Sequence, residues 1–459
     1  MTVLCFALLN AGFFFLSWWF DLARPVFNID YVFALLLMSL GWRWAAIGAA
    51  SVFLLCDILV LLSQVFPFPR LIDLLYLLSL VPYSSISLKL WVAAVTVMLI
   101  VKIIAIRLMA GWVGFKSTLL LLNILLMILI YLVYVAGERE ALTYIKAGDG
   151  LLSSQALTFT SMRSHRFLDG YVGGAPDLQS RPPGASELWF DELSGGQLSS
   201  QLLLIIVESW GVPSNPSVQQ ELMKPLYSVS VDYREEGVLK VSGNTLDGEL
   251  RELCQLRSSR YNLADVKAGF EGCLPNLLKG LGYATAAIHG ATGMMYDRHL
   301  WYSRAGFQEQ TFYESRIWPR RCFSFPGACD QDVADEVIHY FNTEGAKFVY
   351  WLTLNSHSPY DSKDIRTPVF FDCEKYGIDA RLESCRNLQL QSQLFMDLSR
   401  LLGSEALAGV DVIIVGDHAP VIMNLEERRA QFIGDKVPWV RLKTAAPTPP
   451  LQASEQKDR

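Results

Sequence analysis

The first 137 residues of this chain are almost continuously apolar, whereas the residues from about 138 onward have the composition of an ordinary soluble protein. A helix of about 20 apolar residues crosses the hydrocarbon core of a bilayer. A chain of 459 residues is also longer than one compact domain usually is. The sequence therefore predicts an N-terminal bundle of membrane helices over 1–137, followed by a separate soluble part.

Five apolar segments are predicted to span the membrane. Four reach the required length, near residues 2–20, 45–66, 88–106 and 117–137, and a fifth at 30–42 reaches it with its flanking residues. The leucine-rich stretch 69–84, bracketed by prolines, is predicted to be interfacial or re-entrant. Because the first segment has no basic region before it and further apolar segments after it, we interpret it as a span and not as a cleaved signal peptide.

Basic residues predict the orientation of the five spans. The side with more of them carries Arg43, Lys102, Arg107 and Lys116, and the other side carries Arg24, Arg70 and Lys89. Cytoplasmic loops carry the excess of Lys and Arg. The bias predicts a multi-pass protein of the plasma (inner) membrane with an extracytoplasmic soluble part, which is periplasmic in a Gram-negative cell.

Asp57 lies in the middle of the third predicted span. An acid at such a position either relays protons or ions, or hydrogen-bonds to a neighbouring helix. We interpret Asp57 as a helix–helix hydrogen-bonding group, so the sequence does not favour a transporter.

Six cysteines in the soluble part predict disulfide bonds, because an even set in an exported domain is typical of them. Short separations favour Cys322–Cys329 and Cys373–Cys385, which would leave Cys254–Cys273. Six cysteines allow fifteen pairings, so other connectivities stay open. No C-x-x-C spacing occurs, which disfavours a zinc ribbon.

The soluble part is predicted to contain one α/β domain over 201–442. A Gly/Pro/Ser-rich segment at 138–200 is predicted to be a linker or interfacial segment, and 443–459 a disordered tail. Short apolar runs at 202–207, 283–288, 348–354 and 412–415 alternate with helical patterns at 246–256, 274–281, 331–343 and 386–403. Uniformly apolar strands alternating with helices indicate a mostly parallel sheet that is covered on both faces.

Groups that can bind a metal or transfer a proton follow all four predicted strands. They are Glu208, His289, the Asn355-Ser356-His357 segment and the Asp417-His418 pair. In open α/β sheets the ligand site lies at the carboxyl ends of the strands. A single polar residue at a strand end is ordinary, but four such ends predict a shared site.

The residue types at these ends suit a divalent metal. Glu208, Asp417 and His418 supply two carboxylates and an imidazole, a set that zinc and manganese both accept. Thr245 precedes a predicted helix, where free N–H groups and the helix dipole favour a phosphate. From local sequence alone a plain N-cap is the favoured explanation of Thr245.

Five motifs occur in the order found in the lipoteichoic acid synthases. They are Glu208-Ser209-Trp210, Ser242-Gly243-Asn244-Thr245, His289-Gly290 with Tyr296-Asp297-Arg298, Asn355-Ser356-His357-Ser358-Pro359-Tyr360 and Gly416-Asp417-His418. Nearly the whole chain thus resembles that family and its relatives, the phosphoglycerol and phosphoethanolamine transferases of the sulfatase/alkaline-phosphatase superfamily. Those enzymes also carry five N-terminal spans before an exported alkaline-phosphatase-like domain.

The resemblance implies roles for individual residues. Glu208, Thr245, Asp417 and His418 match the family's metal ligands, and Thr245 also matches its nucleophile. The residues that match contacts to the substrate's phosphate and head group are His289, Arg298 and His357. Tyr296 stands where the lipoteichoic acid synthases have a tryptophan, Ala291 replaces a polar residue, and Ala419-Pro420 follows the metal motif. The first two departures bear on which head group is transferred.

The resemblance implies a two-step transfer through a phospho-threonine. Thr245, activated by zinc or manganese, would attack a phospholipid phosphodiester and expel diacylglycerol, and Arg298 would stabilise the phosphate oxygens. A hydroxyl of a cell-envelope glycan or lipid would then take the phosphoglycerol or phosphoethanolamine group. His289 or His357 would protonate the leaving oxygen and deprotonate the acceptor.

Other functions stay open beside this transferase. A hydrolase of the same fold would use water as acceptor, and a non-catalytic subunit of a glycan-export or envelope-polysaccharide assembly complex would keep only the fold. A sulfatase is disfavoured because Cys273-Leu274-Pro275, the nearest match to its nucleophile motif, has Leu277 at the required arginine position. The net charge of −6 and the lack of a basic stripe give no indication of a nucleic-acid partner.

Overall fold

The computed structural model describes the chain apart from residues 1, 20–21, 23, 66–70, 85, 110, 136–150, 163–177, 182–183, 260–261, 326, 423 and 447–459. The chain forms two compact units. The N-terminal unit comprises Met1–Ala175 with Met423–Leu425, and the C-terminal unit comprises Pro176–Ile422 with Glu426–Arg459.

The N-terminal unit is helical. Its helices are α1 (Thr2–Trp19), α2 (Asp30–Ser39), α3 (Arg43–Val65), α4 (Leu71–Ser79), α5 (Ile86–Met109) and α6 (Phe115–Val135). Within the described residues, three stretches are long and apolar enough to cross a membrane, namely Thr2–Trp19, Arg43–Leu62 and Leu88–Met109. Two shorter apolar helices, Asp30–Ser39 and Phe115–Tyr131, cover the other predicted spans. The count of five spans therefore stays a prediction.

Asp57 is fully buried in α3 and forms an ion pair with Arg24 at 2.8 Å. Its carboxylate also accepts hydrogen bonds from Asn28 at 3.3 Å and from Tyr31 at 2.8 Å. The predicted hydrogen-bonding role of Asp57 is confirmed. Because four donor contacts compensate the buried carboxylate, the pair ties α2, α3 and the α1–α2 connection together.

Part of the predicted linker belongs to the N-terminal unit. Strand β2 (Leu152–Ser153) pairs in parallel with β1 (Phe27–Asn28), and the helix that follows is α8 (Gln155–Met162). Asp30 accepts hydrogen bonds from the Ser154 hydroxyl at 2.5 Å and from the Ala156 amide at 2.9 Å. The predicted linker 138–200, inferred from its Gly/Pro/Ser-rich composition, therefore contains an ordered segment at 152–162 that packs on the helices of the N-terminal unit.

We expect Asp57→Asn to destabilise the N-terminal unit, because the Arg24 guanidinium would stay buried without its counter-charge. Loss of one partner of a buried pair costs about 3–5 kcal/mol. The double variant Arg24→Gln/Asp57→Asn should lose less. Thermal unfolding of the full chain in detergent measures both, and an unchanged midpoint for the single variant would contradict the expectation.

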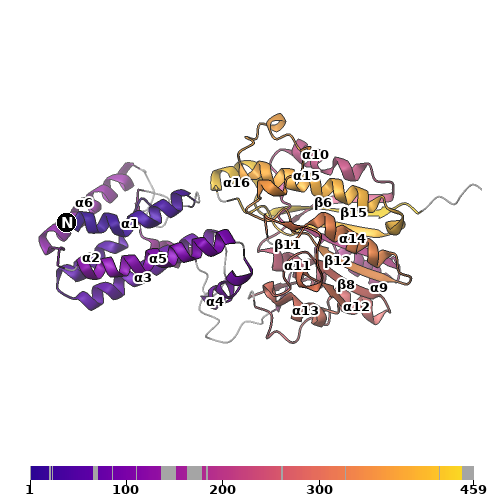
Figure 1. Cartoon of the computed structure of the whole chain (residues 1–459), viewed down its shortest axis with the longest axis horizontal. Helices are drawn as coiled ribbons and strands as arrows, with labels where there is room; N and C mark the ends of the chain where they lie inside the picture. Colours follow the sequence, from indigo (N-terminus) through magenta and orange to yellow (C-terminus); the bar gives the residue numbers. More distant parts are fainter. Residues whose placement is uncertain are drawn as a thin grey trace, which may run out of the picture. The chain divides into compact units, whose positions relative to one another are not determined.

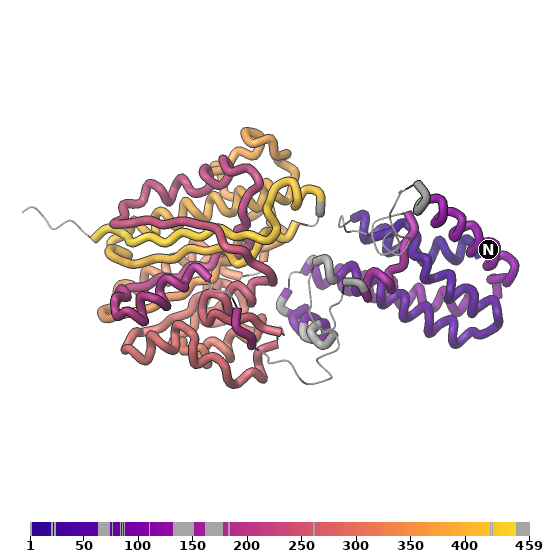
Figure 2. Tube along the Cα trace, turned by 180° about the vertical axis from the view of Figure 1, so that it is seen from behind, coloured from indigo at the N-terminus to yellow at the C-terminus, as the bar shows by residue number. Residues whose placement is uncertain are grey.

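The C-terminal unit is built on a mostly parallel sheet, as predicted. The described residues form seven strands in the order β6-β15-β13-β4-β12-β8-β9. The parallel strands are β4 (Gln201–Val207), β8 (Ala284–His289), β9 (Glu309–Thr311), β12 (Lys347–Leu352) and β13 (Asp411–Gly416). Two strands that the sequence did not predict, β6 (Val231–Lys240) and β15 (Lys436–Thr444), add an antiparallel edge. They lie side by side in Figures 1 and 2.

Helices cover both faces of this sheet (Figure 1). One face packs against α10 (Pro216–Tyr227), α14 (Asp330–Phe341) and α15 (Glu383–Leu402). The other packs against α9 (Glu187–Gly195), α11 (Thr245–Cys254), α12 (Leu274–Gly280) and α13 (Arg298–Ala305). Successive side chains of a strand enter opposite faces, so the inner positions of the central strands, 202–207, 348–352 and 412–415, are apolar throughout.

Three disulfide bonds join the six cysteines of this unit as predicted. The pairs are Cys254–Cys273, Cys322–Cys329 and Cys373–Cys385. The first links the end of α11 to the start of α12. The predicted tail begins two residues too early, because Lys443 and Thr444 belong to β15, and the part from 447 lies outside the described residues.

Candidate functional site

Four neighbouring strands bring the predicted site residues to one edge of the sheet. Strands β13, β4, β12 and β8 are adjacent and parallel, so their carboxyl ends lie together. Glu208 follows β4, His289 ends β8, and Asp417 follows β13. The structure thus places the four polar strand ends as the sequence predicts.

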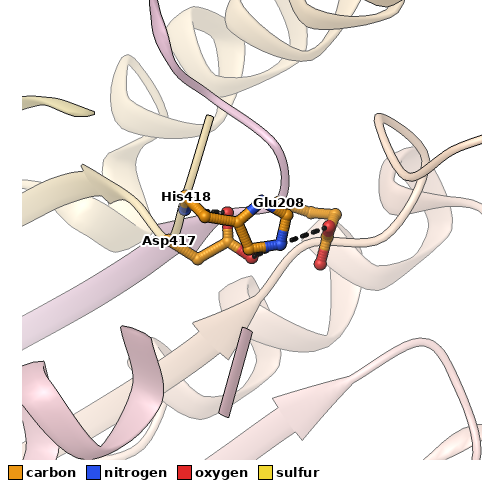
Figure 3. Close-up of side chains that lie close together, drawn as sticks. All are labelled: Glu208, Asp417 and His418. Carbon is orange, nitrogen blue, oxygen red and sulfur yellow. Dashed lines mark hydrogen bonds and ion pairs between the residues drawn. The ribbon is translucent and has the colours of Figure 1, made fainter. Parts of the chain in front are cut away.

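Glu208, Asp417 and His418 form a compact cluster at this edge (Figure 3). His418 Nε2 lies 3.5 Å from Glu208 Oε1 and 3.3 Å from Asp417 Oδ2. One ligand atom from each of the three residues lies within 4.8 Å of the other two. A cation at their centre could therefore be reached by all three side chains.

The protonation pattern of the cluster suits a cation. His418 Nδ1 lies 2.8 Å from the Ala419 carbonyl oxygen, which can only accept, so Nδ1 carries a proton and Nε2 is the ring nitrogen that faces the carboxylates. Burial opposes a charge on His418, but Asp417 and Glu208 raise its pKa. Asp417 Oδ2 is buried without a hydrogen-bond partner. Burial and the nearby Glu208 carboxylate raise the pKa of Asp417 to about 7. Two carboxylates and an imidazole nitrogen facing one another in a buried space are the donor set of a divalent metal site.

Thr245 completes the cluster from the first residue of α11. Its hydroxyl lies 3.2 Å from Glu208 Oε2 and 3.3 Å from His418 Nε2. The cap of the helix is Asn244, whose side chain accepts from the Asp247 amide in a capping box. The N-cap alternative for Thr245 is therefore wrong, and its hydroxyl is free for the site.

Helix α11 also holds the loop that carries Asp417, through residues that the sequence analysis missed. Gly248 packs directly on this loop, because a Cβ there would lie 2.8 Å from Asp417 Cβ. The buried Arg251 guanidinium donates to the carbonyl oxygens of Asp417 at 3.1 Å and Gly416 at 2.7 Å. The sequence does show Gly248 and Arg251 at helical spacing after Thr245. It does not show their partners, which lie more than 160 residues further along the chain.

Two further histidines border the cluster in the neutral state. His289 Nδ1 lies 3.0 Å from the Leu352 carbonyl oxygen, and His357 Nδ1 lies 2.5 Å from that of Ser358. Burial and the Arg298 cation lower the pKa of His289 well below its usual value. Burial lowers the pKa of His357 to about 4. Each imidazole thus offers Nε2 as a proton acceptor.

The loop that carries His357 is anchored by a buried acid that the sequence analysis also missed. Asp330, the first residue of α14, accepts from the amides of Leu354 at 2.9 Å and Asn355 at 2.8 Å. The Asn355 side chain returns a bond by accepting from the Asp330 amide at 2.6 Å. The reciprocal contacts fix the chain just before His357.

Arg298 lies at the start of α13, after two residues with left-handed backbone, Tyr296 (φ 56°) and Asp297 (φ 56°). Its guanidinium lies 5.0 Å from the centre of the Tyr296 ring. Both side chains are coupled electrostatically to the site. Besides burial, Arg298 lowers the pKa of His289. Burial raises the pKa of Tyr296, and Glu208 adds to this shift while Arg298 opposes it. The structure therefore gathers Tyr296, Arg298, His289 and His357 around the metal-type cluster.

Residues 242–434 match the family model described as Sulfatase. The match contains Thr245, His289, Arg298, His357 and the Asp417-His418 pair. A sulfatase-type domain, which the motifs predict, is confirmed over these residues. No curated protein sequence matches the chain.

Solved structures with similar folds include three proteins of low sequence identity. The lipoteichoic acid synthase LtaP of Listeria monocytogenes aligns over 55% of this chain and 66% of its own, with 14% identity and a TM-score of 0.40. The Streptococcus pyogenes phosphoglycerol transferase GacH, in complex with sn-glycerol-1-phosphate, aligns over 58% and 78%, with 14% identity and a TM-score of 0.40. The periplasmic domain of EcEptC from Escherichia coli, in complex with Zn, aligns over 53% and 72%, with 15% identity and a TM-score of 0.35. The chain thus spans slightly less than two thirds of LtaP.

We expect zinc or manganese to stabilise the protein through this cluster. A ligand at 100 times its dissociation constant stabilises the folded state by about 2.7 kcal/mol. Asp417→Asn should lose most of this shift in the unfolding midpoint. Asp411→Asn, at the other end of the same strand, is the matched control and should keep it. Equal metal shifts in wild type and Asp417→Asn would contradict the assignment.

We also expect the free energy of unfolding to fall in acid because of the lowered pKa of His289. Its lowered pKa means that the unfolded chain takes up a proton below pH of about 6.5 while the folded chain does not. Stability is therefore lost as pH falls, by about 1.4 kcal/mol per pH unit for one proton. His289→Gln should reduce this slope between pH 6 and 5, and the exposed His339→Gln should not. Chemical denaturation at each pH measures it, and equal slopes in wild type and His289→Gln would contradict it.

Proposed function

We propose that this protein is a membrane-bound, metal-dependent transferase. It moves a phosphoglycerol or phosphoethanolamine head group from a phospholipid to a glycan or lipid of the cell envelope. Thr245 carries the group as a covalent phospho-threonine between two steps. The observation that carries the proposal is the position of the Thr245 hydroxyl, 3.2 Å from Glu208 and 3.3 Å from His418 at a helix N-terminus.

The metal ligands in this proposal are Glu208, Thr245, Asp417 and His418. A zinc or manganese ion bound there would act as a Lewis acid that lowers the pKa of the Thr245 hydroxyl and neutralises charge on phosphate oxygens. The donor set of two carboxylates, one imidazole and one hydroxyl suits either ion.

In the first step the Thr245 oxygen forms a bond to phosphorus, and the bond from phosphorus to the diacylglycerol oxygen breaks. Glu208 and His418 hold the hydroxyl oxygen in place. The N-terminus of α11 favours the negative charge of the incoming phosphate. Arg298 stabilises the non-bridging oxygens. The departing diacylglycerol oxygen takes up the proton that the Thr245 hydroxyl loses, relayed by His289 or His357.

In the second step the acceptor hydroxyl attacks phosphorus, and the bond to Thr245 breaks. His289 and His357 are neutral, so either can accept the acceptor's proton at Nε2. The imidazolium formed in this way then returns this proton to the Thr245 oxygen as its bond to phosphorus breaks. Because of the low pKa values, both imidazoles are neutral at rest. This state agrees with a role in activating the acceptor hydroxyl.

A phospholipid donor agrees with the membrane helices of the same chain. Within the described residues, three of them are long and apolar enough to span a bilayer, so the chain that carries the candidate site also carries membrane-spanning segments in this proposal. The motif resemblance supports phosphatidylglycerol and phosphatidylethanolamine as donors. The sulfatase alternative is further disfavoured, because Cys273 is bonded to Cys254 and is not a free nucleophile.

The proposal is tested by the mass of the peptide that contains Thr245 after incubation of the metal-loaded full chain with each lipid. We expect an added phosphoglycerol or phosphoethanolamine mass with one donor, and no addition in Thr245→Ala. Thr245→Ser should retain a labelled peptide because it keeps the hydroxyl. No covalent adduct with either lipid would contradict the two-step transfer, and transfer of the adduct to water alone would identify a hydrolase.

A further inference from the structure

Glu249 is fully buried one helical turn after Thr245, and four donor groups surround its carboxylate. Oε2 accepts from Arg298 Nε at 3.0 Å and from Arg298 Nη2 at 2.8 Å. Oε1 accepts from the hydroxyl of Tyr350 at 3.0 Å and from that of Tyr302. A buried carboxylate with this many donors is fully compensated, and it forms the centre of a closed polar network.

The network joins three elements of the C-terminal unit. Glu249 lies on α11, Arg298 and Tyr302 on α13, and Tyr350 on β12. Arg298 is 2% exposed, and the Glu249 carboxylate keeps its pKa above the ordinary arginine value. The arginine therefore stays a cation although it is buried.

The contacts determine the direction of the guanidinium. Because this group is planar, fixing Nε and Nη2 on one carboxylate oxygen also fixes Nη1. Nη1 makes no hydrogen bond to the residues that the structure describes, although Nε and Nη2 are both occupied. Arg298 thus has one oriented donor group that the protein does not use.

We propose that Glu249 is a positioning residue for phosphate. It fixes the Arg298 side chain in one orientation through Nε and Nη2. The unused Nη1 group then donates to a non-bridging oxygen of a phosphate ester on Thr245. Because Glu249 and Thr245 share α11, the nucleophile and the phosphate-binding cation are held at a fixed separation. This inference rests on the proposed function for the identity of the ligand, a phosphate ester.

The test is a double-mutant cycle on the full chain in detergent, loaded with Zn²⁺ and titrated calorimetrically with inorganic phosphate. Glu249→Gln keeps the shape of the side chain and removes its charge. We expect it to weaken phosphate binding about 10- to 100-fold, the usual effect of losing a group that orients a ligand-binding residue. In an Arg298→Gln background the same substitution should change the dissociation constant less than twofold, because Glu249 acts only through Arg298.

The matched control is Asp411→Asn, which breaks another buried pair, between Asp411 and Arg441 at 2.6 Å. Glu249→Gln and Asp411→Asn should both lower the unfolding midpoint. Only Glu249→Gln should weaken phosphate binding, and neither of these two variants should reduce the amount of bound zinc. The proposal would be overturned if the affinity losses of Glu249→Gln and Arg298→Gln multiplied in the double variant. It would also be overturned if Asp411→Asn weakened phosphate binding as much as Glu249→Gln does. A wild-type protein that binds no phosphate would overturn it as well.

The two proposals fail in different ways. If no lipid labels Thr245 but phosphate binding still depends on Glu249 through Arg298, the transfer reaction is wrong and the positioning role stands. If Thr245 is labelled normally in Glu249→Gln and phosphate affinity is unchanged, the transfer reaction stands and the positioning role is wrong.

Discussion

Two buried carboxylates at the ends of neighbouring parallel strands are the constraint on which the candidate site depends. Strands β4 and β13 pair directly, so Glu208 and Asp417 must emerge side by side. Burial and this proximity raise the pKa of Asp417, and one of its oxygens accepts no hydrogen bond within the described structure. A cation would compensate a buried pair of this kind, and His418 adds an imidazole at the same point.

Helix α11 fixes the geometry of the site around the Glu208 and Asp417 carboxylates. Its successive turns contribute the Thr245 hydroxyl, the close packing of Gly248 on the Asp417 loop and the bonds from Arg251 to that loop. Glu249 extends the same helix to Arg298. One rigid element thereby relates the proposed nucleophile, metal ligands and phosphate-binding group, as expected for catalysis that depends on preorganised groups.

The sequence predicted the strand ends of the site because buried parallel strands are marked by uninterrupted apolar runs. Glu208, His289 and the Asp417-His418 pair each follow such a run, so their convergence required only the rule that parallel strands end at one edge. Glu249 and Arg251 could not be predicted in this way. Acidic and basic residues of a helix are usually solvated, and their partners lie 49 and 166 residues further along the chain.

The same limit applies to the rest of the fold. Strand β6 alternates exposed and partly buried residues at the antiparallel edge, so it lacks the apolar run that marked the central strands. The segment from Leu152 to Met162 has ordinary polar composition, and its place in the N-terminal unit depends on pairing with residues near Phe27. Local sequence carries no information on a partner that is more than 100 residues away.

The position of the bound metal tests the central claim most directly. Anomalous diffraction at the zinc or manganese edge, from crystals of the metal-loaded full chain, should give a peak about 2.0–2.2 Å from oxygen and nitrogen atoms of Glu208, Asp417 and His418. The Thr245 oxygen should lie in the same coordination shell. A peak at another position, or no peak in protein that carries stoichiometric metal, would contradict the account.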